Sequence, residues 1–144
     1  MPGLQVWRTH KSREARETRR VVIDMQALFA SAIEDALRKS GFGFDTVKAK
    51  SPEQTLSLCQ AEPTAVLLMD AMTYPPRTLA ERLKIREKLK KSVPACKVVL
   101  MVDENSERDA ADRVRLAKKD GLIDEFIYSC SASAAYIAAV IDAL

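Results

Sequence analysis

Asp70 is the residue of this chain that is best placed to do chemistry. It ends an apolar run, Ala65-Val66-Leu67-Leu68-Met69-Asp70, and a proline-rich loop at residues 71–76 follows directly. Asp24 likewise ends a shorter β-branched run at residues 20–24. A carboxylate that follows a buried strand lies at the carboxyl edge of a parallel sheet, where ligands bind in α/β folds. The pattern therefore predicts a reactive carboxylate at that edge, provided that the chain supplies partners for it.

Other catalytic and metal-binding arrangements find little support in the sequence. His10 is the only histidine and lies near the N-terminus, which leaves none for a triad or a metal cluster in the folded body. The three cysteines form no C-x-x-C pair, so neither a disulfide framework nor a zinc site is indicated. The four glycines form no phosphate-binding loop. Asp70 also lacks the second aspartate of the Asp-x-Asp motif that haloacid-dehalogenase phosphatases require.

The apolar pattern predicts the elements that would hold Asp24 and Asp70 at one edge. We expect strands at residues 20–24, 44–49, 64–70, 98–102 and 124–129. We expect helices at residues 26–40, 52–62, 77–92, 106–120 and 131–144. Strands that alternate with helices imply a parallel sheet covered on both faces. The predicted fold class is α/β, a five-stranded, doubly wound, flavodoxin-like (βα)5 sheet.

Three helix starts and two helix surfaces complete this prediction. Ser51, Ser106 and Ser131 are expected to cap the helices that follow them, Ser106 in a capping box with Asp109. Charged side chains cover most of residues 77–92, where we expect a solvated basic face, with a docking surface as the alternative. The inward stripe expected for the helix at 26–40 consists of Leu28, Phe29, Ala32, Ile33 and Leu37.

Length and composition fit one globular domain. The 144 residues are 47% hydrophobic and 30% charged, which is enough for one full core. No stretch approaches the ~20 apolar residues of a membrane span, and residues 1–20 lack the apolar segment of a secretory signal. A reducing cytoplasm is the expected compartment because the cysteines show no disulfide pattern. We expect a basic tail at residues 1–19, partly disordered or helical, and a folded domain at residues 20–144.

The net charge of +3 is concentrated at the N-terminus. Residues 1–20 carry a formal charge of +4, so the remainder is near neutral at about −1. Basic arms of this kind bind the phosphates of nucleic acids. The same residues include Glu14 and Glu17, so a salt-bridged helical lead-in to the first strand is an equally open interpretation.

The element order and three short segments resemble a response-regulator receiver domain over residues 20–144. Residues 24–29, Asp-Met-Gln-Ala-Leu-Phe, are similar to the segment that follows the first strand of that family. Residues 67–70 resemble the strand that carries the phosphoacceptor aspartate, and residues 121–124 the stretch before the last strand. The resemblance implies that Asp70 accepts a phosphoryl group, with Mg²⁺ held by Asp24, Asp70 and the backbone carbonyl of Met72.

The implied site departs from the family pattern at three positions. Met25 stands where the family has a second metal-binding acid, and a thioether is a poor ligand for Mg²⁺. Either Met101 or Val102 replaces the hydroxyl residue that ends the fourth strand. Either Tyr128 or Ser129 replaces the lysine that ends the fifth strand. Each change removes a charge or donor aimed at the same phosphoryl group, so phosphorylation is expected to be impaired or absent.

The expected function is that of an atypical, stand-alone receiver domain that is not an enzyme and signals through protein–protein contacts, with no required cofactor. The resemblance implies a partner protein or a second copy on the surface formed by residues 106–120, 124–129 and 131–144. One alternative is a two-component switch that a histidine kinase phosphorylates at Asp70 with Mg²⁺ as cofactor. Asp103 or Glu104 would then replace the metal-binding acid that is missing at Met25. A second alternative is a nucleic-acid-associated regulator that uses the basic residues 8–20.

Overall fold

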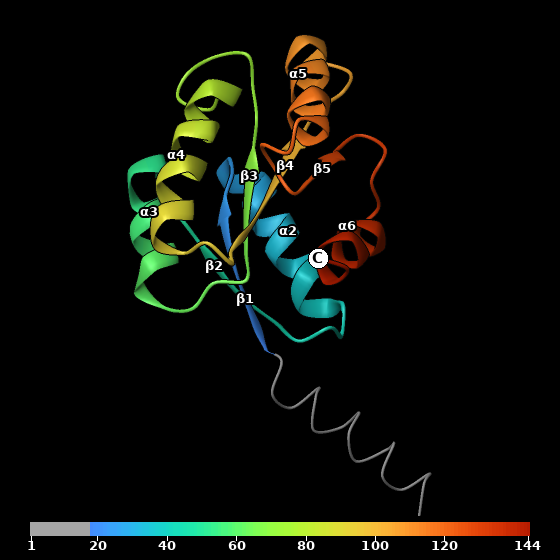
Figure 1. Cartoon of the computed structure of the whole chain (residues 1–144). Coiled ribbons are helices and arrows are strands. Elements are labelled where there is room, and N and C mark those ends of the chain that lie inside the picture. The colour runs from blue at the N-terminus through green and yellow to red at the C-terminus, as the bar shows by residue number, and fades with distance from the viewer. Residues whose placement is uncertain (1–17) are drawn as a thin grey trace, which may run out of the picture.

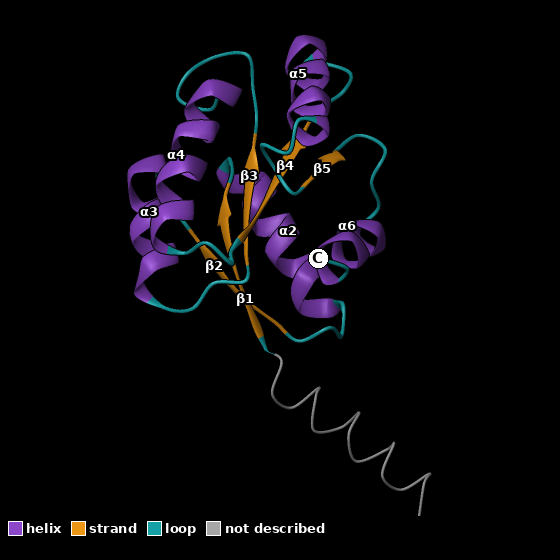
Figure 2. Ribbon diagram, viewed as in Figure 1, coloured by secondary structure: helices purple, strands orange, loops and turns teal. Residues whose placement is uncertain are grey.

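Five parallel strands form one sheet with helices on both faces in the computed structural model, which describes residues 18–144 (Figures 1 and 2). The strands are β1 Arg19–Asp24, β2 Phe44–Lys48, β3 Val66–Asp70, β4 Lys97–Val102 and β5 Glu125–Tyr128. The helices are α2 Ala27–Lys39, α3 Pro52–Ala61, α4 Leu79–Ser92, α5 Arg108–Lys119 and α6 Ala134–Asp142. The strand order is β2-β1-β3-β4-β5, which is the flavodoxin-like order. The predicted five-stranded, doubly wound α/β fold is therefore confirmed.

The sheet separates two cores, which explains the continuous apolar sequences of its central strands. All five residues of β3 are buried. Leu68 packs into the core beside α2 and α6, whereas Leu67 and Met69 pack into the core beside α3, α4 and α5. Because successive side chains of a strand point to opposite faces, a strand buried on both faces needs apolar residues at every position.

The predicted inward stripe of α2 is partly wrong. Ile33 and Leu37 are buried as expected, and Ala30 joins them. Leu28 is 88% exposed and Phe29 is 54% exposed, and Ala32 is exposed as well. The first turn of α2 lies at the carboxyl edge of the sheet, where Phe29 lines a cavity instead of packing into the core.

Of the three predicted serine caps, Ser51 is confirmed in position, and Ser106 and Ser131 are wrong. Ser51 occupies the N-cap position of α3, but its side chain makes no capping hydrogen bond. Ser106 lies in the turn before α5, and its backbone N–H donates to Asp103 Oδ1 at 3.0 Å. Ser131 lies outside α6, which is capped by Ser133 instead. For α5 and α6, therefore, the serine predicted to cap the helix lies one or two residues before the residue that occupies the N-cap position.

The solvated basic face expected for residues 77–92 is interrupted by one arginine. α4 starts at Leu79, and a capping box joins Thr78 to Glu81 at its N-terminus. Arg82, in the first turns of this helix, has no exposed surface at all. A fully buried arginine needs partners for its charge, and these partners define the site described below.

The first strand begins one residue earlier than predicted, because Arg19, which was assigned to the tail, joins Arg20 in β1. Arg19 opens β1, and its guanidinium donates to the backbone carbonyl of Asp142 at 3.0 Å. Arg20 donates to Thr64 Oγ1 at 2.9 Å. Residues 1–17, on which the other predictions about the tail fall, lie outside the described residues. Residues 1–18 carry a formal charge of +2 once Arg19 and Arg20 are assigned to the strand.

Between residues 18 and 144, none of the helices has the length and apolar character that crossing a membrane requires.

Candidate functional site

The carboxyl ends of β1 and β3 bring Asp24 and Asp70 to one edge of the sheet. The two strands are hydrogen-bonded neighbours, with Asp24 in register with Met69. Asp24 is fully buried, and Asp70 is 6% exposed. Thr55 of α3 donates from Oγ1 to Asp24 Oδ2 at 2.6 Å. The backbone N–H of Gln26 donates to Asp70 Oδ2 at 3.1 Å. Both carboxylates are therefore held in fixed orientations by neighbouring elements.

Arg82 of α4 lies between these two carboxylates. Its Nη1 donates to Asp24 Oδ2 at 2.8 Å, and its Nη2 donates to Asp70 Oδ1 at 2.7 Å. Its Nε donates to the backbone carbonyl of Asp70 at 2.7 Å, and Nη2 also reaches the carbonyl of Asp24 at 3.1 Å. The planar guanidinium presents several N–H donors in fixed directions, which suits it to bridging acceptors on two strands. Arg82 thus ties α4 to the ends of β1 and β3.

Arg77, in the loop between β3 and α4, adds a second cation. Its Nη1 lies 2.9 Å from Asp70 Oδ1 and 3.2 Å from Asp24 Oδ1. Its backbone carbonyl accepts the N–H of Met72 at 2.7 Å, which fixes the loop that carries it. Two guanidinium groups therefore face two carboxylates, and the formal charge of the four side chains is balanced.

This arrangement does not fit Mg²⁺. The carboxylates of Asp24 and Asp70, which the family resemblance assigns to the metal, already form ion pairs with two guanidinium groups. Mg²⁺ requires near-octahedral oxygen coordination and usually keeps several waters. An ion bound by these carboxylates would lie against two positive charges that already balance the site. Metal binding by Asp24, Asp70 and the Met72 carbonyl would require the arginines to leave.

The strand register distinguishes the alternative positions that the sequence left open. Met101 pairs with Asp70, and Met101 lines the cavity next to it, whereas Val102 packs in the opposite core. Ser129 lines the same cavity, whereas Tyr128 packs against the opposite core. Met101 and Ser129 are therefore the residues that face Asp70 at the positions where the family has a hydroxyl residue and a lysine.

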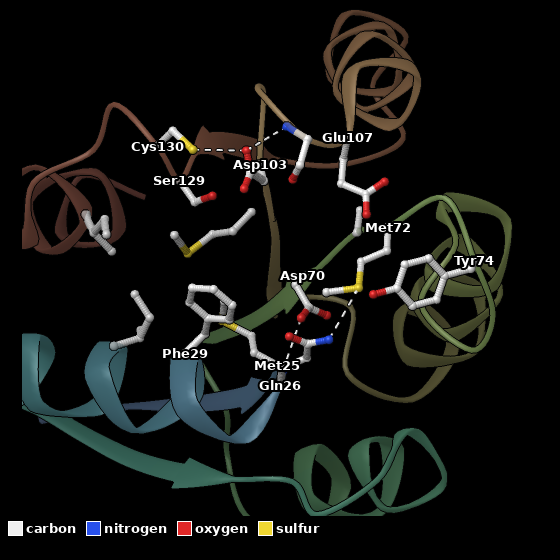
Figure 3. A pocket seen from close by; sticks show the side chains of 15 residues that line it. Met25, Gln26, Phe29, Asp70, Met72, Tyr74, Asp103, Glu107, Ser129 and Cys130 are labelled. Carbon is white, nitrogen blue, oxygen red and sulfur yellow. Dashed lines mark hydrogen bonds between the residues drawn. The ribbon is translucent and has the colours of Figure 1, made fainter.

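A cavity of about 410 Å³ lies beside Asp70. Figure 3 shows the side chains that line it. Met25 lies in its wall, so all three substituted positions contribute side chains to one space. The cavity is bounded by the first turn of α2, the loops after β3 and β4, the end of β5 and the start of α6. Its lining is predominantly apolar near Met25 and Ile33 and carries carboxylates at Asp103 and Glu107.

Asp103 and Glu104 organise the loop after β4 and do not contact Asp24 or Asp70. The Cys130 thiol, followed by the backbone N–H of Ser106, holds the pKa of Asp103 below its usual range. The hydrogen bond to Asp103 raises the pKa of the Cys130 thiol. Glu104 accepts from the backbone N–H of Cys130 at 2.9 Å and from that of Ser131 at 3.2 Å. These carboxylates fasten the β4 loop to the segment after β5.

Arg77 and Arg82 are the site residues that sequence reasoning missed. Arg82 and Leu89 are the two buried residues of α4. They are seven positions apart, and Arg82 is three positions after Leu79, so Arg82 occupies an inward position of the helical repeat. An arginine at an inward position of an amphipathic helix was the available signal for a buried ion pair. Arg77 lies in a loop and carries no comparable signal.

Similarity to known proteins is found at the level of structure. No family model and no curated protein matches the sequence. A response regulator from Thermotoga maritima is 16% identical, with 88% of this chain and 96% of that chain covered and a TM-score of 0.66. A CheY-like receiver domain protein from Methanospirillum hungatei is 15% identical, with 88% and 93% covered and a TM-score of 0.68. An orphan response regulator from H. pylori is 17% identical, with 89% and 97% covered and a TM-score of 0.65. The chain therefore has the fold of the response-regulator receiver domain.

Proposed function

We propose that this chain is a receiver-like signalling module that acts through protein–protein contacts and does not depend on phosphorylation of Asp70. The observation that carries the proposal is the position of Arg82 between Asp24 and Asp70, at 2.8 and 2.7 Å. A cation supplied by the chain itself replaces the metal that a phosphorylated receiver would need at this place.

The hydrogen bonds of Asp70 oppose attack on a phosphodonor. Asp70 Oδ1 accepts from Arg82 and Arg77, and Oδ2 accepts from the backbone N–H of Gln26. A carboxylate oxygen that attacks phosphorus must give up such bonds, and the transferred group then needs cations and donors around it. Met25, Met101 and Ser129 supply neither a metal ligand of the right kind nor a positive charge.

The partner surface that we propose consists of α5, β5 and α6. Three large apolar side chains are exposed there: Leu116 on α5, Leu122 before β5 and Tyr136 on α6, at 46%, 40% and 55% exposure. α5 and α6 pack on opposite faces of the sheet, whose edge strand here is β5, so a partner that contacts all three side chains would lie across this edge. Because aromatic residues are enriched at interfaces, Tyr136 is the side chain that we expect to contribute most to binding.

A phosphorylation assay tests the first part of the proposal. Full-length protein is incubated with acetyl phosphate and Mg²⁺, and phosphate incorporation is followed by intact mass, with the Asp70→Asn variant as the control. We expect no phosphoprotein above the level of Asp70→Asn. Rapid Mg²⁺-dependent incorporation that Asp70→Asn abolishes would instead support the alternative, a switch phosphorylated at Asp70.

A comparison of surface variants tests the second part. Sedimentation first determines whether the chain self-associates, and cross-linking with mass spectrometry identifies the contact surface of the dimer or of an identified partner. We expect Leu116→Glu and Tyr136→Glu to weaken that association. Leu28→Glu is the matched control, since Leu28 is exposed on α2, outside the proposed surface. Loss of association in the control variant alone would contradict the assignment.

A further inference from the structure

The proposed function assigns no ligand to the cavity beside Asp70. Its volume of about 410 Å³ lies within the range of about 300–1,000 Å³ that is usual for small-molecule sites. It adjoins the carboxyl edge of the sheet, where α/β folds bind their ligands. Methionines at positions 25, 72 and 101 contribute to its lining, and flexible, polarizable side chains of this kind adapt to varied apolar ligands.

One part of the cavity is suited to an apolar body. Met25, directly after β1, and Phe29, Ile33 and Ile137, from α2 and α6, present carbon and sulfur atoms. Phe29 retains 54% exposure although it lies in this wall, so covering it would remove apolar surface from water. Tyr74, from the loop after β3, is a second half-exposed aromatic side chain in the lining.

The charges of the lining are all negative. Among the cavity-lining residues of the described part of the chain, the ionised side chains are the carboxylates of Asp70, Asp103 and Glu107, and no lysine, arginine or histidine is present. Arg82 and Arg77 form ion pairs with Asp70 and balance its charge. Asp103 and Glu107 form no ion pair with a cation of residues 18–144.

Asp103 and Glu107 are held by neutral donors. Asp103 Oδ1 accepts from the Cys130 thiol at 2.9 Å and from two backbone N–H groups. Glu107 Oε2 accepts from the backbone N–H and the hydroxyl of Thr73, at 3.1 and 2.7 Å. Figure 3 shows both carboxylates across the view from Met25 and Phe29. Two fixed negative charges therefore lie beside an apolar wall without a positive partner from the described residues.

We propose that this cavity binds a small organic cation, a molecule with an apolar body about the size of one aromatic ring and an ammonium group. The body would cover Phe29 and Met25, and the ammonium group would lie near Asp103 and Glu107. An anionic ligand of the same shape would be repelled by the two carboxylates. This inference needs neither a partner protein nor a particular state of Asp70, so it stands or fails separately from the proposed function.

Three probes that share a phenylethyl body and differ in the charge of their polar group test the inference on the full-length chain. ¹⁵N-labelled protein at neutral pH is titrated with 2-phenylethylamine, which is then a cation, with neutral 2-phenylethanol, and with anionic 3-phenylpropanoate. We expect saturable amide shifts at Met25, Ser106 and Ser129 with the amine. The amine should bind about tenfold more tightly than the alcohol, since its charge meets two carboxylates, and the acid should not bind.

Variants identify the groups responsible. Glu107→Gln keeps an oxygen for the Thr73 bonds and removes one charge, so it should weaken binding of the amine severalfold and leave binding of the alcohol unchanged. Asp112→Asn is the matched control, because it removes a carboxylate of α5, the helix that Glu107 precedes, and Asp112 lies outside the cavity lining. Ser129→Leu should weaken both ligands by filling the cavity, and an unchanged thermal midpoint would show that the variant still folds.

Two results would overturn the inference. Equal or tighter binding of the alcohol or the acid would refute the preference for cations. Shifts that do not saturate with any probe, or that saturate only outside the cavity, would refute the site itself.

Discussion

Arg82 Nη2 lies 2.7 Å from Asp70 Oδ1, and no part of the Arg82 side chain reaches solvent. The pair joins the second turn of α4 to the last residue of β3, and the same guanidinium reaches Asp24 at the end of β1. The carboxylate that sequence reasoning identifies as the reactive group is thus one partner of a buried ion pair.

Replacing Arg82 tests how strongly this pair supports the fold. Arg82→Met should lower the free energy of unfolding by about 3–5 kcal/mol, because it leaves Asp24 buried with only the more peripheral Arg77 as a cation. Urea unfolding measures the change. Lys84→Met is the matched control, since Lys84 is exposed on the same helix, and its effect should stay within about 0.5 kcal/mol. Similar effects for both variants would contradict the structural role of Arg82.

Removing both arginines should create the metal site that they displace. The double variant Arg77→Ala with Arg82→Ala leaves Asp24 and Asp70 as two adjacent carboxylates without cations, which is the donor set that Mg²⁺ prefers. We expect Mg²⁺ to raise the thermal midpoint of this variant by binding its folded form, and to leave that of the unmodified chain unchanged.

The single variant Arg77→Ala is the control for this metal experiment. Arg82 alone still occupies the space between the carboxylates, so Mg²⁺ should not stabilise this variant. Saturable Mg²⁺-dependent NMR shifts at Asp24 and Asp70 of the unmodified chain would contradict our conclusion that this site does not fit Mg²⁺.

The hydroxyl of Thr55 orients Asp24 for Arg82. It donates to Asp24 Oδ2 at 2.6 Å in a fully buried environment. Thr55→Val should cost about 1–3 kcal/mol in unfolding free energy, because a buried carboxylate oxygen loses its donor. The comparison is Thr73→Val, which removes a similar but exposed hydrogen bond to Glu107 and should change stability by less than about 0.5 kcal/mol. Equal costs would show that burial of the Thr55 bond is unimportant.

Asp103 should contribute a pH-dependent part of the stability. The Cys130 thiol and the backbone N–H of Ser106 hold the pKa of Asp103 below its usual range in the folded state. A group whose pKa is lower in the folded state stabilises the fold above its unfolded pKa of about 4, and this stability is lost as the pH falls. Between about pH 5 and about pH 3, Asp103→Asn should therefore lose less stability than the unmodified chain.

Urea midpoints at each pH measure this difference. Asp112→Asn serves as the control because its carboxylate is exposed on α5, 3.9 Å from Arg115. It should retain the acid sensitivity of the unmodified chain. An Asp103→Asn variant with the same loss of stability on acidification as the control would refute the role assigned to the hydrogen bonds of Asp103.

Local patterns in the sequence were sufficient for the architecture. The apolar runs at 64–70 and 98–102 predicted buried parallel strands because a strand covered on both faces needs apolar residues at every position. The sequence also predicted that Asp24 and Asp70 lie at one edge of the sheet. Each residue ends an apolar run, and the carboxyl ends of parallel strands lie at the same edge. The caps and the inward face of α2 were less predictable, because they depend on where the core ends around Leu28 and Ser106.

By itself, the sequence determined the α/β class, the five strands and the two aspartates at the carboxyl edge, because burial and periodicity are recorded in consecutive residues. Only the tertiary structure decided what those aspartates do. Arg82 lies 58 positions from Asp24, and their contact depends on how α4 crosses the end of the sheet and on the direction of one long side chain. Such a pairing leaves no local pattern beyond an arginine at an inward position of a helix. The buried guanidinium therefore changes a predicted reactive carboxylate into part of a balanced ion-pair network.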